Sequence, residues 1–303
     1  MIGISAQMQH VYGLIHQASA YGYPVLITGE KGTGKKLAAQ TIHSLSQREE
    51  KSFVVADFST LAPTLAESEL FGYERGAFTG ANQTQWGLLA FAREGTILLK
   101  EVGNLPLHVQ SRFVQMLQEK EFKPIGSSQP LPFKARVLAA TSRDLEADVK
   151  RGVFRQDLFL WLNAAQINLV PLRERKGDIP LLIDYFLEKH AGADAAETKF
   201  SAAAIEYLGG HSWPGNVREL EGTVRRAISV RSGETIEASD CALKPKAPDD
   251  RQWAEDVTVY LDERERQSIV QALRESQGDK SNAARLLGIA ESAFQKRLQY
   301  YHL

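Results

Sequence analysis

The chain has 303 residues, enough for two or three compact units, and its 43% of apolar residues is typical of a globular protein. Its formal net charge is −1, so no basic field covers the whole molecule and any nucleic-acid site has to be local. A single cysteine, Cys241, excludes an internal disulfide and a cysteine-based metal cluster, and we expect no metal site. No run approaches the roughly 18 apolar residues of a membrane span, and the N-terminus does not resemble a signal peptide, which predicts a cytoplasmic protein with no membrane partner.

The pattern along the chain predicts an α/β unit, a helical unit, a linker and a small all-α module. Within the α/β unit, residues 1–170, short apolar runs alternate with helix-like segments from Tyr23 to about Val170, which predicts a parallel sheet with candidate strands at 25–27, 53–56, 96–99 and 137–140. Residues 171–242 are helical in pattern, and Asn216 with Glu219 three residues later predicts a capped helix start. Charge and proline mark residues 243–257 as a linker before the module at 258–303.

A glycine-rich loop follows the first candidate strand and precedes a helix. In this arrangement backbone N–H groups and the helix N-terminus cradle phosphates, and a lysine reaches the outer phosphates. The loop therefore predicts an ATP site formed by Gly29, Gly32, Thr33, Gly34 and Lys35. The next residue is Lys36 where the general pattern has Ser or Thr, so the usual hydroxyl ligand of magnesium is missing.

A second glycine-bracketed loop has an aromatic residue at its tip and consists of Gly76, Ala77, Phe78, Thr79, Gly80 and Ala81. An ordinary hairpin tip and a partner-binding loop both fit an isolated Phe-Thr-Gly. With the preceding Glu69-Leu70-Phe71-Gly72, the hexapeptide resembles the loop by which bacterial enhancer-binding proteins, the AAA+ activators of sigma-54 RNA polymerase, contact that sigma factor. The resemblance covers nearly the whole chain and implies an AAA+ P-loop domain with a helical lid, beginning at the ATPase domain. It also implies sigma-54 as a partner and self-association as a dimer or hexameric ring.

The catalytic pattern implied by this resemblance is broken at the end of the candidate strand 96–99. The family ends this strand with Asp-Glu, whereas this chain has Lys100-Glu101. Glu101 is the residue that would polarise the attacking water. A protonated lysine cannot replace the aspartate as a magnesium ligand, so magnesium binding and hydrolysis are both in question.

Three more catalytic positions depart from the family. Asp57 stands where the family has an asparagine that positions the glutamate, and Ser142 stands at the sensor asparagine. Of two arginines that reach a neighbouring subunit's nucleotide, Arg155 remains and Trp161 replaces the other. Together with Lys100, these departures predict a degenerate site. Asp57 and Lys100 form either a charge-swapped pair or two independently solvated groups.

The C-terminal third resembles the family's lid and its DNA-binding domain. The segment 213–220 matches the lid motif whose arginine senses nucleotide phosphates, and Arg218 takes that role. Residues 280–300 have the pattern of a Fis-type helix-turn-helix, with a local charge of +3 from residue 280 onward. The predicted DNA contacts, to an inverted-repeat site, are Lys280, Arg285, Ser292, Gln295, Lys296 and Arg297.

Three hypotheses follow. The chain is a DNA-binding regulator that binds nucleotide with little or no hydrolysis, an active ATPase that remodels sigma-54 polymerase, or a non-catalytic subunit of a mixed AAA+ ring. Some relatives bind a cyclic dinucleotide, so a regulator that responds to such a ligand is a further alternative, although no residue indicates it.

Overall fold

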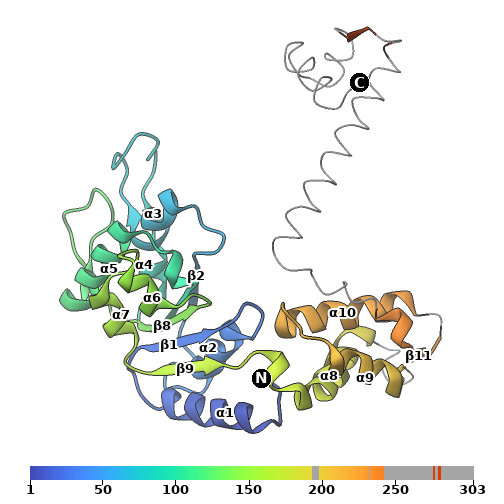
Figure 1. Cartoon of the computed structure of the whole chain (residues 1–303). Coiled ribbons are helices and arrows are strands. Elements are labelled where there is room, and N and C mark those ends of the chain that lie inside the picture. Colours follow the sequence, from blue (N-terminus) through green and yellow to red (C-terminus); the bar gives the residue numbers. More distant parts are fainter. Residues whose placement is uncertain (193–197, 232, 242–275, 277–278, 281–303) are drawn as a thin grey trace. The chain divides into compact units, whose positions relative to one another are not determined.

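The computed structural model describes residues 1–192, 198–231, 233–241, 276 and 279–280 (Figure 1). The chain divides into two compact units, Met1–Ala242 and Leu243–Leu303, and nearly all described residues belong to the first. The predicted linker and almost all of the predicted helix-turn-helix lie outside the described residues.

A five-stranded parallel sheet lies at the centre of the first unit, in the order β2-β5-β8-β1-β9. Its strands are β1 (Val25–Gly29), β2 (Phe53–Asp57), β5 (Thr96–Lys100), β8 (Arg136–Thr141) and β9 (Gln166–Leu169). The α/β fold class and the four predicted strands are confirmed, whereas β9 was not predicted. Because all five strands are parallel, their carboxyl ends meet at one edge of the sheet.

Helices cover both faces of this sheet, and alternate strand residues enter two separate cores. On β5, Ile97 and Leu99 belong to one core and Leu98 to the other. The core around Leu98 is closed by α1 (Ala6–Ser19) and α2 (Lys35–Ser44). The opposite core is closed by α3 (Ala66–Phe71), α4 (Leu88–Ala92), α5 (Leu107–Glu119), α6 (Leu145–Lys150) and α7 (Gln156–Leu162).

Two loops lie side by side beyond α3 (Figure 1). The first, which we call the contact hairpin, comprises residues 72–86: the antiparallel strands β3 (Gly72–Tyr73) and β4 (Gln85–Trp86) and the loop that joins them. The second loop comprises residues 123–130 between β6 (Glu121–Phe122) and β7 (Leu131–Pro132). Ile125 joins them: its N–H donates to Gly72 O and its carbonyl accepts from Glu74 N, each at 2.9 Å.

The lid is built from α8 (Ile179–Ala191), α9 (Ala202–Gly210) and α10 (Asn216–Val230), with a short parallel pair of β10 (Lys199–Phe200) and β11 (Thr235–Ile236). Trp213 is fully buried within it and donates its indole N–H to Leu208 O at 3.0 Å.

The predicted cap of α10 is wrong. The N-cap is Gly215, whose N–H donates to the Glu219 carboxylate at 2.8 Å. Asn216 is the first helical residue, at φ 54°, and its side chain turns toward the glycine-rich loop instead of capping the helix.

Candidate nucleotide-binding site

The glycine-rich loop connects β1 to α2 and ends at Lys35, the first residue of that helix. Lys35 is 7% exposed, and its ammonium donates to the carbonyls of Gly29 at 2.7 Å and Glu30 at 3.0 Å. Burial lowers the pKa of Lys35. The nearby Glu101 carboxylate raises this pKa in part, and the positive charges of Lys100 and Arg218 lower it further. Three cationic groups, Lys35, Lys100 and Arg218, thus lie near the loop amides, an arrangement that suits a polyphosphate.

Lys100 and Asp57 form a pair across adjacent strands at the carboxyl edge of the sheet. They are register partners at the ends of β5 and β2, and the Lys100 ammonium donates to Asp57 Oδ2. Burial alone would raise the pKa of Asp57, but the hydrogen bonds from Lys100 and Ser59 outweigh it and lower the pKa. Of the two alternatives left open by the sequence, the charge-swapped pair is confirmed.

Glu101 is held by two neighbours. Its Oε2 accepts from the N–H of Ser142 at 3.0 Å and from the Ser142 hydroxyl at 2.7 Å, and its Oε1 lies 3.5 Å from Lys35 Nζ. Its backbone has φ 54°, a conformation uncommon for any residue other than glycine and asparagine. Ser142 therefore fixes the Glu101 carboxylate, while Asp57 is engaged with Lys100.

The lid contacts the glycine-rich loop directly. A Cβ on Gly32, whose φ is 83°, would lie 2.1 Å from Gly215 O, so the loop backbone can approach the lid only without a side chain. Asn216 Nδ2 donates at 3.0 Å to both the Glu30 carboxylate and Lys31 O. Arg173 donates two further hydrogen bonds to Glu30, at 2.8 and 2.6 Å. Glu30, Arg173 and Asn216 form what we call the lid latch.

The backbone of Arg218 lies close to the same loop, and its N–H donates to Gly32 O at 3.4 Å. Its guanidinium has no ion pair within the described parts of the chain, and it lies near enough to Lys35 to lower the pKa of that residue. Lys36 is exposed on the first turn of α2. The structure thus brings the predicted residues Lys35, Asp57, Lys100, Glu101, Ser142 and Arg218 to one edge of the sheet.

Two predicted residues lie apart from this group, on or next to α7. Arg155 donates to Asp157 at 3.0 and 2.6 Å and to the Ser111 hydroxyl at 3.1 Å. Trp161 is partly buried against the core, with the Lys120 ammonium 5.9 Å from its ring centroid. Neither residue is among the partners of Lys35, Lys100 or Glu101.

The hexapeptide of the contact hairpin forms a tight loop, closed by a 2.9 Å hydrogen bond from Gly76 N to Ala81 O. Phe78 is 47% exposed and meets Tyr73 edge-on, with ring centroids 4.9 Å apart. Ala81 is buried inside the hairpin, so the exposed part of the hexapeptide is its tip.

Of the predicted DNA contacts only Lys280 is described, and it is exposed. Arg285, Ser292, Gln295, Lys296 and Arg297 lie outside the described residues. Within the described part of the chain, no group of three or more His, Cys, Asp or Glu side chains could hold a metal ion, and no helix is long and apolar enough to cross a membrane.

Reasoning from sequence missed the lid latch. Its three members come from the glycine-rich loop, the turn after β9 and the start of α10, and no spacing in the sequence links them. The only signal was Asn216, whose spacing to Glu219 indicates a helix cap instead.

Comparison with known proteins agrees with this architecture. Residues 1–168 match the family described as Sigma-54 interaction domain, residues 173–255 the AAA+ ATPase lid domain, and residues 260–301 the Bacterial regulatory protein, Fis family. The regulatory protein AtoC of Escherichia coli K12 is 40% identical over 290 residues, which cover 91% of this chain and 62% of AtoC. The transcriptional regulatory protein ZraR of the same organism is 40% identical over 300 residues, which cover 98% of this chain and 68% of ZraR.

Solved structures show the same fold. NtrX from Brucella abortus in complex with ATP superposes with a TM-score of 0.73 at 26% identity, covering all of this chain and 70% of that one. The same protein in complex with ADP gives a TM-score of 0.74 at 27% identity. The chain therefore spans about two thirds of the length of these relatives.

Proposed function

Because this chain belongs to the family of sigma-54 enhancer-binding transcriptional regulators, we propose that it is a DNA-binding regulator that binds ATP and hydrolyses it little or not at all. The supporting observation is the Lys100–Asp57 pair beside Glu101. In this reading Lys35, Arg218 and the glycine-rich loop hold the phosphates, while the residues for turnover are incomplete.

Lys100 does not fit a magnesium ion at the position where the family's aspartate would hold it. A protonated ammonium offers no lone pair, and its charge repels the metal. At an effective dielectric of about 20, two unit charges 4 Å apart interact by roughly 4 kcal/mol, and a divalent ion doubles this. Asp57 offsets part of that charge, but its carboxylate is already engaged by Lys100 and Ser59.

Trp161 removes a second requirement for hydrolysis. An arginine that reaches into a neighbour's site stabilises charge in the transition state and is worth about 10³–10⁵ in rate. Tryptophan has no charge to supply that stabilisation. Arg155 alone remains, and in the isolated chain it is paired with Asp157.

ATP binding should therefore depend only weakly on magnesium. Lys35, Lys100 and Arg218 together can neutralise phosphate oxygens that a metal ion normally neutralises. Titration calorimetry with ATP in EDTA and in magnesium should give dissociation constants within a few-fold of each other, and Lys35→Ala should abolish the heat in both buffers. A strict magnesium requirement would show that Lys100 points away from the bound phosphates.

A second candidate is a non-catalytic subunit of a mixed ring, and the retained hexapeptide favours it. The exposed tip at Phe78 keeps a surface that could contact sigma-54 while a partner subunit hydrolyses ATP. Mixing the chain with a catalytically intact relative tests this. In the presence of sigma-54, adding this chain should change the ATPase rate of the relative, and adding the Phe78→Ala variant of this chain should not. An ATPase rate that stays the same at every ratio of this chain to the relative would oppose a mixed ring.

A further inference from the structure

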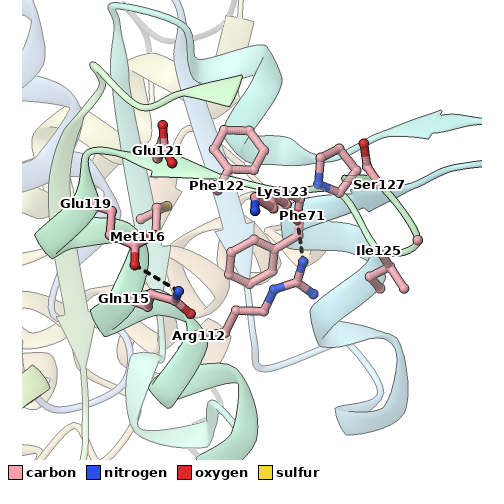
Figure 2. Close-up of a pocket in the computed structure, with 12 residues that line it drawn as sticks. Phe71, Arg112, Gln115, Met116, Glu119, Glu121, Phe122, Lys123, Ile125 and Ser127 are labelled. Atoms are coloured by element: carbon pink, nitrogen blue, oxygen red, sulfur yellow. Dashed lines mark hydrogen bonds between the residues drawn. The ribbon is translucent and has the colours of Figure 1, made fainter. Parts of the chain in front are cut away.

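Arg112 lies on α5 at the point where the contact hairpin and the second loop leave the α/β unit. It lines a cavity of about 320 Å³ with Phe71, Phe122 and residues 123–127 of the second loop (Figure 2). Figure 2 shows its guanidinium directed toward the backbone of that loop and the ring of Phe71. Arg112 is not among the hydrogen-bond or ion-pair partners of Lys35, Lys100 or Glu101 in the described part of the chain, and neither hydrolysis nor phosphate binding gives it a role.

Three different groups engage the Arg112 guanidinium. Nη1 donates to Glu67 Oε1 of α3 at 2.6 Å, and Nη2 donates to the carbonyl of Lys123. The guanidinium carbon lies 4.3 Å from the centroid of the Phe71 ring. A planar fork of donors that also stacks on an aromatic face is a geometry that lysine cannot reproduce. Arg112 thus ties α5 to the start of α3 at Glu67, to its end at Phe71 and to the start of the second loop.

The second loop in turn supports the contact hairpin. Ile125 exchanges two backbone hydrogen bonds with Gly72 and Glu74, and Tyr73 and Ile125 form a parallel bridge. One residue later, Gly126 lies against the hexapeptide. With φ 81°, it occupies a conformation that other residues rarely adopt, and a Cβ there would lie 2.7 Å from the Cβ of Ala77.

We propose that Arg112 is a positioning residue for the contact hairpin: by holding the second loop at Lys123, it fixes the support on which Gly72–Ala77 rest. A partly exposed ion pair with Glu67 would alone contribute little to stability. The hydrogen bond to Lys123 O has a different effect from the ion pair with Glu67. Its acceptor is a backbone carbonyl of the second loop, so a donor held in a fixed position favours one conformation of that loop. The positioning role itself does not depend on the proposed function; only its consequence for sigma-54 binding rests on that proposal.

Hydrogen exchange on the full chain tests the positioning role without sigma-54. Arg112→Met keeps the bulk of the side chain and removes its donors. It should speed amide exchange about tenfold in peptides covering 72–86 and 123–130, while peptides of β1, β5 and β8 stay unchanged. Arg112→Lys should give an intermediate effect, since it keeps the charge but loses the fork. Gln115→Ala is the control, because Gln115 lines the same cavity and bonds to Glu119.

Unchanged exchange in both loops of Arg112→Met, or an equal increase in the central strands, would overturn the proposal. In the second case Arg112 would be a general stabilising residue. Gly126→Ala disturbs the same support from the other side and should also speed exchange across 72–86. Gly152→Ala is its control, since Gly152 has φ 72° and, among the described residues other than its chain neighbours, no atom lies within 4 Å of the position that a Cβ would take there.

Binding to purified sigma-54 separates the two proposals. If the wild-type chain binds, Arg112→Met and Gly126→Ala should each weaken binding about tenfold while ATP affinity stays constant. Equal sigma-54 affinity in wild type and both variants would contradict the positioning role. If wild type does not bind sigma-54 at all, the proposed contact fails, and the exchange result alone decides the role of Arg112.

Discussion

At the scale of single residues, the proposed loss of hydrolysis depends most on Lys100, which places a positive charge at the end of β5 where the resemblance to the family implies an aspartate. The structure shows where the compensating charge lies, on Asp57 at the same register of β2. The two residues are therefore coupled, and a change at one alters the electrostatics of the other. The carboxylate of Glu101 is left with Lys35 and Ser142 as partners.

This coupling predicts that Lys100→Asp alone will not restore hydrolysis. The variant would place two carboxylates side by side at residues 57 and 100, and Ser142 and Trp161 would remain unchanged. Because residues of a catalytic site act as a unit, we expect a steady-state rate within about tenfold of the background. The combined variant Lys100→Asp, Asp57→Asn and Trp161→Arg is the matched comparison. Robust hydrolysis by Lys100→Asp alone would mean that the other departures are harmless.

At the scale of elements, the lid latch joins the glycine-rich loop to the start of α10. Asn216 is fully buried, and its side chain bonds to Leu172 N at 2.8 Å as well as to Glu30 and Lys31. Removing it leaves the buried N–H of Leu172 without its partner, which costs about 1–3 kcal/mol, and it also removes the two bonds to Glu30 and Lys31 of the glycine-rich loop. The latch therefore holds the glycine-rich loop against the start of α10, next to Arg218.

Asn216→Ala should weaken ATP binding about tenfold or more, because the loop and Arg218 would no longer be held together before binding. Titration calorimetry measures the affinity, and circular dichroism establishes that the variant is folded. Asn168→Ala is a suitable control, since Asn168 is an exposed asparagine on β9 whose side-chain oxygen accepts a hydrogen bond from the Thr28 hydroxyl of the neighbouring strand β1 at 3.1 Å. Unchanged affinity in Asn216→Ala would restrict the latch to a purely structural role.

Much of the fold could be predicted because its signals are local. The four predicted strands are continuous apolar runs, and the glycine-rich loop has a fixed spacing. Strand β9 could not be found in this way: it has only four residues, with Gln166 and Asn168 exposed, and it becomes a strand by pairing with β1. Asn216 was misassigned for a similar reason, because a capping pattern is local whereas its partners are 44, 185 and 186 residues away in the chain.

The candidate site was predicted as a set of positions; of its internal pairing, only the Asp57–Lys100 pair was considered, as one of two alternatives. The Asp57–Lys100 pair required the register of β2 against β5, and the role of Ser142 as the donor to Glu101 required the ends of β5 and β8 to be adjacent. Arg112 carried no sequence signal, because its partners come from α3 and the second loop.

At the scale of the whole molecule, residues 258–303 should bind DNA as a dimer on an inverted repeat. One helix-turn-helix reads a half-site, and two-fold symmetry places two recognition helices about 34 Å apart. Lys296→Ala and Arg297→Ala should each weaken binding and flatten its salt dependence, as lost phosphate contacts do. Gln295→Ala should relax sequence preference while keeping non-specific affinity. A footprint covering a single half-site, or binding that survives deletion of 280–303, would contradict this assignment.

We propose that nucleotide binding and hydrolysis are separated in this protein, and a steady-state ATPase assay tests this claim most directly. The purified chain should be measured with saturating ATP and magnesium across a range of protein concentrations, beside a catalytically intact relative under the same conditions. A range of protein concentrations is needed because subunits of a ring assemble only at sufficient concentration. We predict a rate at or near background for this chain at every concentration. A rate within about tenfold of the intact relative would contradict the claim.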